Sequence, residues 1–321
     1  MGHRHASFAW EGSIMSPTSF DSPVCLLLPF VFDSMAKIAP ERAAEISKGL
    51  LPAFRLTDKP GLAFSAATEA TPPVISIPLR GLEYLWALSY STWVIHDHYS
   101  QPGRTSVDLD FKAHDDTRPI SKFLVWALKN QMSGDYALWP RGTPIPGPLT
   151  EDRQARPLIE AITNEMTLCA VSWILHHERS HIEEGHSATV PLVQDEAEAD
   201  RAATVWLMDD AAPGIVAAKR GFGIAIATIG IAMYELLSAR AGGSSNDTHP
   251  NPAARIFSAL SHERVAAEPV VAQVAAVMLK LLLHLGSVDV GSEVYEGPQE
   301  ALNHYCMFLQ RAIEAARRQH R

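Results

Sequence analysis

The residues best suited to chemistry lie between positions 171 and 203, where residues 177–181 read His-Glu-Arg-Ser-His. Residues four apart on a helix share one face, so His177 and His181 can turn their imidazoles toward one metal ion. Glu178 lies about 100° around the helix and can reach a water molecule held by that ion. Zinc accepts histidine nitrogen and carboxylate oxygen, and a hydrolytic Zn²⁺ site with three protein ligands keeps one position open for water.

A second acidic segment follows at short range, because residues 196–200 read Glu-Ala-Glu-Ala-Asp. On its own helix, Glu196 is the expected third zinc ligand. Asp200 lies one turn further on the same face and is expected to hold the free ring N–H of a ligand histidine. His186 is a weaker alternative for the third ligand, since it lies five residues from His181 and beyond Gly185.

The H-E-x-x-H motif is by itself only suggestive, and its context strengthens it. A mostly apolar run at 167–175 precedes the motif and would bury the helix that carries it, and Gly185 offers a helix stop. The alternative is a pair of surface helices, rich in histidine and glutamate, that are solvated and inert.

Another segment carries side chains that could act in catalysis. Residues 245–255 read Ser-Asn-Asp-Thr-His-Pro-Asn-Pro-Ala-Ala-Arg. His249 lies on a proline-flanked loop ahead of a helix expected to start near Pro252. In a zinc hydrolase, His249 or Arg255 could donate a hydrogen bond to the oxyanion as it forms. Equally, His249 could cap a loop and Arg255 could pair with an acid. The residues alone do not decide between these roles.

Composition sets the broad class of protein. The chain has 321 residues, 47% hydrophobic and 20% charged, enough for a sizeable core in one large or two small domains. Its net charge of −9 argues against nucleic-acid binding, which needs a basic face. Its three cysteines are far apart and form no C-x-x-C pair, which favours a reduced, cytoplasmic setting. A protein or peptide substrate is the expected partner.

The predicted fold class is α+β, predominantly helical, with a small sheet. The expected helices are 40–52, 82–99, 122–130, 158–184, a helix capped by Asp195, 213–241, 270–285 and 298–318. The expected strands are 74–78 and an edge strand at 106–111, and the apolar residues 25–32 are expected to be a strand or a docked segment.

The proline- and glycine-rich residues 141–157 mark the best candidate boundary. Residues 1–140 would form an α+β part that supplies one wall of a cleft. Residues 158–321 would form the helical, zinc-binding part.

The apolar run Gly221–Tyr234 raises the question of a membrane span. It has 14 residues between charged neighbours and falls short of the about 20 that a spanning helix needs. The beginning of the sequence lacks the features of a secretory signal. We therefore expect a buried helix, no span long enough for a membrane, and a cytoplasmic protein.

The order H-E-x-x-H, E-x-E-A-D and T-H-P-x-x-x-x-R resembles the gluzincin peptidases related to the HtpX proteases. The segments HHERSHIEEGH and DEAEADRAA, with LEYLWALSY upstream, look closer still to the phage-exclusion peptidases of the Lit type. The resemblance covers residues 170–260 well and 82–90 weakly. It implies a zincin-like core, His177, His181 and Glu196 as zinc ligands, and Glu178 as general base. It also implies that Asp200 supports a ligand and that His249 lies near the transition state.

This sequence departs from those families in two respects. Some gluzincin relatives are integral membrane proteins, and no span here reaches the required length. Arg179 and Ser180 are more polar than the usual filling of the motif, so the helix is expected to be more exposed to water than in those relatives.

Three functions from different classes follow. The favoured one is a soluble zinc endopeptidase, in phage exclusion or a stress response. The second is a regulatory protease-like protein, resembling the antirepressor-cleaving proteases of mobile elements. The third is a zinc-binding interaction module without turnover, which a three-ligand site disfavours because structural zinc usually has four protein ligands.

Overall fold

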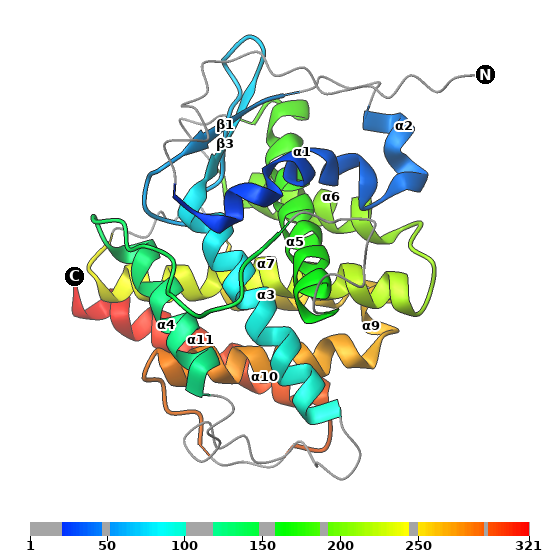
Figure 1. Ribbon diagram of the computed structural model, residues 1–321. Coiled ribbons are helices and arrows are strands. Elements are labelled where there is room, and N and C mark those ends of the chain that lie inside the picture. Colours follow the sequence, from blue (N-terminus) through cyan, green and yellow to red (C-terminus); the bar gives the residue numbers. More distant parts are fainter. Residues whose placement is uncertain are drawn as a thin grey trace.

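The computed structural model describes residues 21–46, 52–100, 118–147, 158–186, 192–243, 250–291 and 295–320. Its elements, in chain order, are η2 (Pro23–Leu27), α1 (Leu28–Lys37), η3 (Pro40–Arg42), α2 (Ala43–Ile46), β1 (Ala53–Thr57), β2 (Ser65–Ala67), β3 (Val74–Pro78), α3 (Leu79–Ser100), α4 (Arg118–Met132), α5 (Leu158–Glu183), α6 (Val193–Met208), α7 (Ile215–Arg240), α8 (Pro252–Leu260), α9 (Glu263–Ala266), α10 (Pro269–Leu285) and α11 (Pro298–Gln319). The small sheet lies at one end of the molecule and α10 and α11 at the other (Figure 1). The prediction of a mainly helical α+β protein is confirmed.

The sheet has three strands in the order β1-β3-β2. β1 is parallel to β3 and β2 is antiparallel to it, which leaves β2 at one edge. The predicted strand at 74–78 is confirmed as β3, whose Ile75 and Ile77 are fully buried. β3 runs directly into α3, so the sheet and the helical body are joined without a loop.

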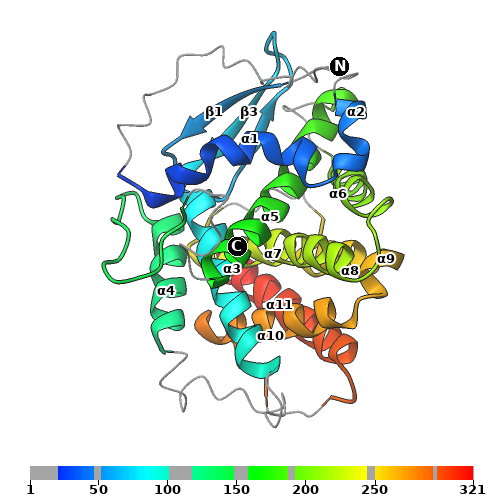
Figure 2. The ribbon, with the colours of Figure 1, turned by 45° about the vertical axis from the view of Figure 1, so that its right-hand side comes forward.

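Helix α5 is the central element and lies between the sheet and the C-terminal helices in both views (Figures 1 and 2). It packs against α7, α6, α3 and α1. Its middle is buried all round, which explains why the sequence before the H-E-x-x-H motif is almost continuously apolar. The helix expected at 158–184 is confirmed. The motif therefore lies on a helix held on several sides.

The apolar run at 221–234 forms part of α7, which has 26 residues. The expectation that no helix is long enough to span a membrane was wrong. By length and composition alone, both α5 and α7 could cross one. Apolar residues continue α7 on both sides of the run. In the structure, 67% of the most apolar part of α5 and 72% of that of α7 are buried by other parts of the protein.

Two local predictions are wrong, a strand at residues 25–32 and a helix cap at Asp195. Residues 25–32 form the end of η2 and the first half of α1 and not a strand, because Ser22 caps η2 and Pro29 occupies the first turn of α1, where proline is tolerated. Leu27, Leu28, Val31 and Phe32 are buried, which agrees with the alternative of a docked segment. Asp195 does not cap α6. The helix begins at Val193, and Asp195 lies in its first turn, where an acid favours the helix dipole.

The strand expected at 106–111 and residues 148–157 of the expected linker lie outside the described residues. The described part of that segment is a loop, and Gly147 O accepts a hydrogen bond from Asn164 Nδ2 on α5. Trp86 Nε1 on α3 donates to Asn164 Oδ1 at 2.8 Å. Contacts therefore join the two predicted parts, and their division at 141–157 stays a prediction.

Helices α5 and α7 are in close contact at Gly223. A Cβ atom placed there would lie 2.4 Å from Cys169 Cβ and 2.7 Å from the Cys169 carbonyl carbon. Real Cβ atoms do not come so close, and a neighbouring backbone cannot move aside as a flexible side chain can. Glycine at 223 thus fixes the distance between α7 and the helix that carries the motif.

We predict that Gly223→Ala lowers the free energy of unfolding by about 1–3 kcal/mol, because overpacking at this crossing outweighs the better helix propensity of alanine. Chemical denaturation of the purified protein measures this. Gly230→Ala on the same helix is the control. Its Cβ would meet ordinary contacts at 3.4 Å and beyond, so it should be neutral or stabilise by up to about 1 kcal/mol. Equal stability of the two variants would contradict the close crossing.

Candidate metal centre

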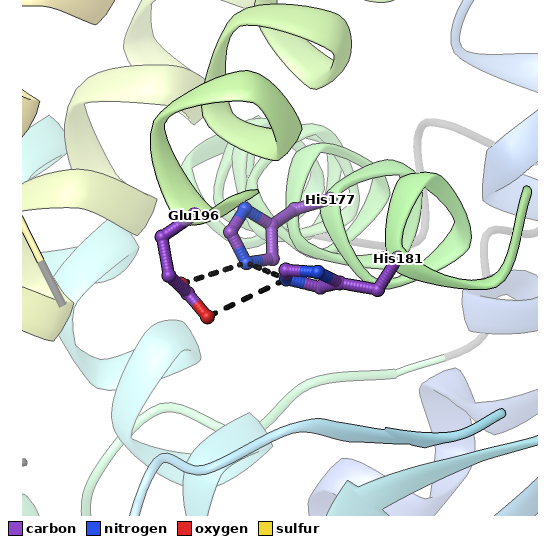
Figure 3. Close-up of side chains that lie close together, drawn as sticks. All are labelled: His177, His181 and Glu196. Carbon is purple, nitrogen blue, oxygen red and sulfur yellow. Dashed lines mark hydrogen bonds and ion pairs between the residues drawn. The ribbon is translucent and has the colours of Figure 1, made fainter. Parts of the chain in front are cut away.

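Three donor atoms from α5 and α6 converge at the end of the molecule that carries the sheet. His177 Nε2 and His181 Nε2 are 3.1 Å apart. Glu196 places Oε2 at 3.4 Å from His177 Nε2 and Oε1 at 3.5 Å from His181 Nε2 (Figure 3). Ligands at about 2.0–2.2 Å from a tetrahedral ion lie about 3.3–3.6 Å from one another. The two nitrogens and the carboxylate therefore have the chemistry and the spacing of a three-ligand metal site.

The packing of α6 on α5 sets this convergence. The ring of Trp173, one turn before His177, lies against the His177 ring with centroids 5.8 Å apart. The Trp173 Nε1–H donates to Thr204 Oγ1 on α6 at 3.0 Å. This bond joins the helices two turns beyond Glu196, and the fixed register brings Glu196 opposite the two histidines.

Behind the donors, Asp200 lies between a histidine and an arginine. His177 Nδ1 is 2.9 Å from Asp200 Oδ1. Arg255, at the start of α8, donates from Nε and Nη2 to the two Asp200 oxygens, each at 2.7 Å. Two hydrogen bonds of this kind fix the plane of the Asp200 carboxylate relative to the plane of the Arg255 guanidinium. Asp200 thus lies against the second ring nitrogen of His177, and Arg255 is paired with an acid.

Charge and burial shift the pKa values of this group in opposite directions. Burial lowers the pKa of His177, but Asp200 and Glu196 outweigh burial and raise it to about 9. Burial also raises the pKa of Asp200, but Arg255 and His177 bring it down to about 2. His181 is different, because burial and the neighbouring His177 lower its pKa to about 4.

Glu178 lies beside the donors without being one of them. It is 8% exposed, and burial raises the pKa of its carboxyl group above the ordinary value, with the nearby Glu196 adding to the rise. The backbone N–H of Ala66, on edge strand β2, donates to its carboxylate and acts in the opposite direction. A buried acid with a raised pKa and a backbone donor from the strand edge is suited to taking up and returning a proton.

The two variable residues of the motif are buried, so the expectation of a more exposed helix was wrong. Arg179 is 5% and Ser180 7% exposed. Arg179 donates to Glu183 one turn later, and its Cζ lies 5.0 Å from the centre of the Trp206 ring on α6. His176 also stacks on Trp206, with ring centroids 4.5 Å apart. The polar residues therefore bind α6 to α5.

The remaining predicted residues lie as follows. His249 lies outside the described residues. His186 is not one of the three donors. It faces the other ring nitrogen of His181, with the two Nδ1 atoms 3.0 Å apart. This placement disfavours His186 as the third ligand.

Sequence reasoning missed two groups close to the site. The first is the Ala66 N–H, because a three-residue strand of small residues gives no clear periodic signal. The second is Glu235 on α7. Burial raises the pKa of Glu235 to about 7, against the opposing charges of Arg255 and Arg317. An acid inside an otherwise apolar helix was the available signal for Glu235.

Comparison with known proteins identifies the family of this chain. The family model described as Peptidase U49 matches residues 75–275, which include α5, α6 and α8. The cell death peptidase of Escherichia coli (strain K12) is 30% identical over 285 residues, 84% of this chain and 91% of the relative. No solved structure matches. The matched region contains the buried His177, His181 and Glu196 together with Glu178, and the chain belongs to the peptidase U49 family.

Proposed function

We propose that this peptidase is a zinc-dependent endopeptidase of the gluzincin type, with a zincin-like core, that cleaves a peptide bond in a protein target. The observation that carries the proposal is the convergence of His177, His181 and Glu196 with the buried Glu178 alongside. Two imidazoles and one carboxylate are the donor set that zinc uses in hydrolytic sites.

The three donors would hold the ion, and Asp200 would orient His177 through its Nδ1. When bound, zinc supplies a Lewis acid that polarises the scissile carbonyl and lowers the pKa of water. Arg255 keeps Asp200 ionised, because its two hydrogen bonds stabilise the carboxylate form. The proposal gives His249 a hydrogen bond to the developing oxyanion, which rests on the sequence pattern alone.

Glu178 is the proposed general base. It accepts the proton of the attacking water and passes it to the leaving nitrogen of the peptide. Burial supports this role, since a carboxyl group with a raised pKa holds a proton more readily at the moment of transfer. The backbone of Ala66 hydrogen-bonds to the carboxylate and favours its ionised form, the form that accepts a proton.

Strand β2 is the proposed binding surface for the substrate. No described strand pairs with its outer edge, and the backbone of Ala66 hydrogen-bonds to Glu178. A strand edge binds an extended peptide through main-chain hydrogen bonds. An unfolded or looped segment of a protein target could therefore lie along β2 with its scissile bond beside the base.

A role in phage exclusion or a stress response is part of the proposal, and the name of the cell death peptidase relative supports it. We further propose a cytoplasmic location without a membrane partner. Support comes from the packing of α5 and α7, whose apolar surfaces are mostly covered by other helices.

We predict about one zinc ion per purified chain. His177→Ala, His181→Ala and Glu196→Ala should each lose it, because two ligands rarely hold zinc against competing buffers. Elemental analysis after gel filtration measures this. His262→Ala, at a histidine outside the site that contacts Asp209, is the control and should keep its zinc. Full zinc content in Glu196→Ala would show that another residue completes the site.

Glu178→Gln should lose roughly 10²–10⁴-fold or more in cleavage rate, since it preserves the shape and removes the base. Its zinc content and thermal midpoint should stay unchanged, because it is not a ligand. Mass spectrometry of new N-termini in expressing cells measures cleavage, with Glu314→Gln on an exposed part of α11 as the matched control. Equal cleavage or equal toxicity of Glu178→Gln would favour a regulatory or structural zinc module.

The location prediction is tested by cell fractionation. We expect the protein in the soluble fraction without detergent, because α5 and α7 bury their apolar residues within the fold. Recovery only in carbonate-resistant membranes would mean that these helices face lipid, as their length permits.

A further inference from the structure

Helix α5 ends in a turn that folds the chain back over its last ligand. Gly185 has a positive φ of 67°, and its N–H donates to Ile182 O. His186 N–H donates to His181 O at 3.0 Å. These two bonds define a Schellman motif, in which the side chain after the glycine contacts the side chain five residues earlier. That contact is usually apolar, but here it joins two imidazoles, those of His186 and His181.

The hydrogen bond between the rings has a defined direction. His181 Nε2 faces His177 and Glu196, so a metal bound there takes the Nε2 lone pair and leaves the proton on Nδ1. The Nδ1–H of His181 then donates to His186 Nδ1 at 3.0 Å. The rings are inclined by 67°, so they meet edge to face and are not stacked.

The other nitrogen of His186 faces acids on α6. With Nδ1 acting as acceptor, the proton of His186 lies on Nε2. That nitrogen is 4.0 Å from Asp195 Oδ1 and 3.9 Å from Glu198 Oε2. The side chain of His186 is 12% exposed, so it is held between His181 and the first turns of α6.

The two ligand histidines thus contact different groups through their second ring nitrogens. His177 faces the ionised Asp200, which Arg255 holds from behind. His181 faces the Nδ1 of a second imidazole, that of His186. A histidine ligand whose second nitrogen is held by a fixed acceptor loses less rotational freedom on binding metal, and its donor atom stays aimed at the site.

We propose that His186 is a positioning residue that fixes the ring orientation and tautomer of His181 and so strengthens metal binding. This inference rests on the proposed zinc site. It excludes His186 from the ligand set, because its Nδ1 contacts the nitrogen of His181 that lies away from the donor group.

Two substitutions at this position separate hydrogen bonding from packing. His186→Leu keeps an apolar side chain of the kind that Schellman turns favour, but offers no acceptor. His186→Asn places its Oδ1 close to the position of Nδ1 and restores the acceptor. The metal affinity of each purified chain is measured with Zn²⁺ alone, by competition with a chromophoric chelator. The thermal midpoint of the metal-free protein and the visible spectrum after Co²⁺ substitution are recorded in parallel.

His186→Leu should weaken zinc binding by roughly 10–100-fold and change the Co²⁺ spectrum, while the metal-free midpoint stays close to that of the wild type. His186→Asn should recover most of the affinity and the spectrum. Wild-type affinity in His186→Leu, or an equal loss in both variants, overturns the proposal. Loss of zinc stoichiometry in both would make His186 a ligand instead. If the wild type takes up no zinc, the metallopeptidase proposal fails as well, whereas tight zinc binding insensitive to His186 refutes the positioning role alone.

Discussion

The arrangement of the site depends on one buried carboxylate, that of Asp200. A charge away from water is costly unless it is paired and fully hydrogen-bonded. Asp200 meets this demand by taking two hydrogen bonds from Arg255 and facing the Nδ1 of His177. Because these three residues lie on α6, α8 and α5, satisfying one carboxylate fixes three helices. Helical spacing then places His177 beside His181, and the packing of α6 on α5 brings Glu196 opposite them.

Much of the site could be predicted because its information is local. Spacings of four residues place His177 with His181 and Glu196 with Asp200, whatever the rest of the fold does. The long helices were equally accessible, since burial leaves continuous apolar runs. The contact of His186 with His181 was not anticipated, although Gly185 was recognised as a helix stop. That contact depends on the geometry of the turn after α5, which the sequence alone does not specify.

Features that depend on distant partners could not be predicted. β1 and β2 have few residues, and only pairing with β3 makes them strands. Residues 25–32 are apolar enough for a strand, and a serine cap with a proline in the first turn makes them helical. The burial of Arg179 depends on Trp206, which lies on another helix. Sequence shows the polarity of such a side chain and not its partner.

Helices α5 and α7 show that composition alone does not distinguish a protein interior from a bilayer. Both are long and apolar enough for either setting. α7 carries Gly223, which permits backbone contact with α5, and Arg220, which pairs with Glu41 and donates to Leu207 O. These partners, a carboxylate and a backbone carbonyl, are groups of the protein itself, and they hold the charge of Arg220 inside the fold.

The three donors of the site have a further consequence for assembly of the fold. They lie between residues 177 and 196, on two helices adjacent in the chain. The entropy of chain closure grows slowly with the length of the loop, so bringing these donors together costs about 1 kcal/mol less than closing the Asp200–Arg255 pair, whose members are 55 residues apart. The donor group is thus the short-range part of the centre, and its charged surroundings are the long-range part. Loss of the Asp200–Arg255 contact would therefore disturb the long-range part of the centre first, and the donor group only through it.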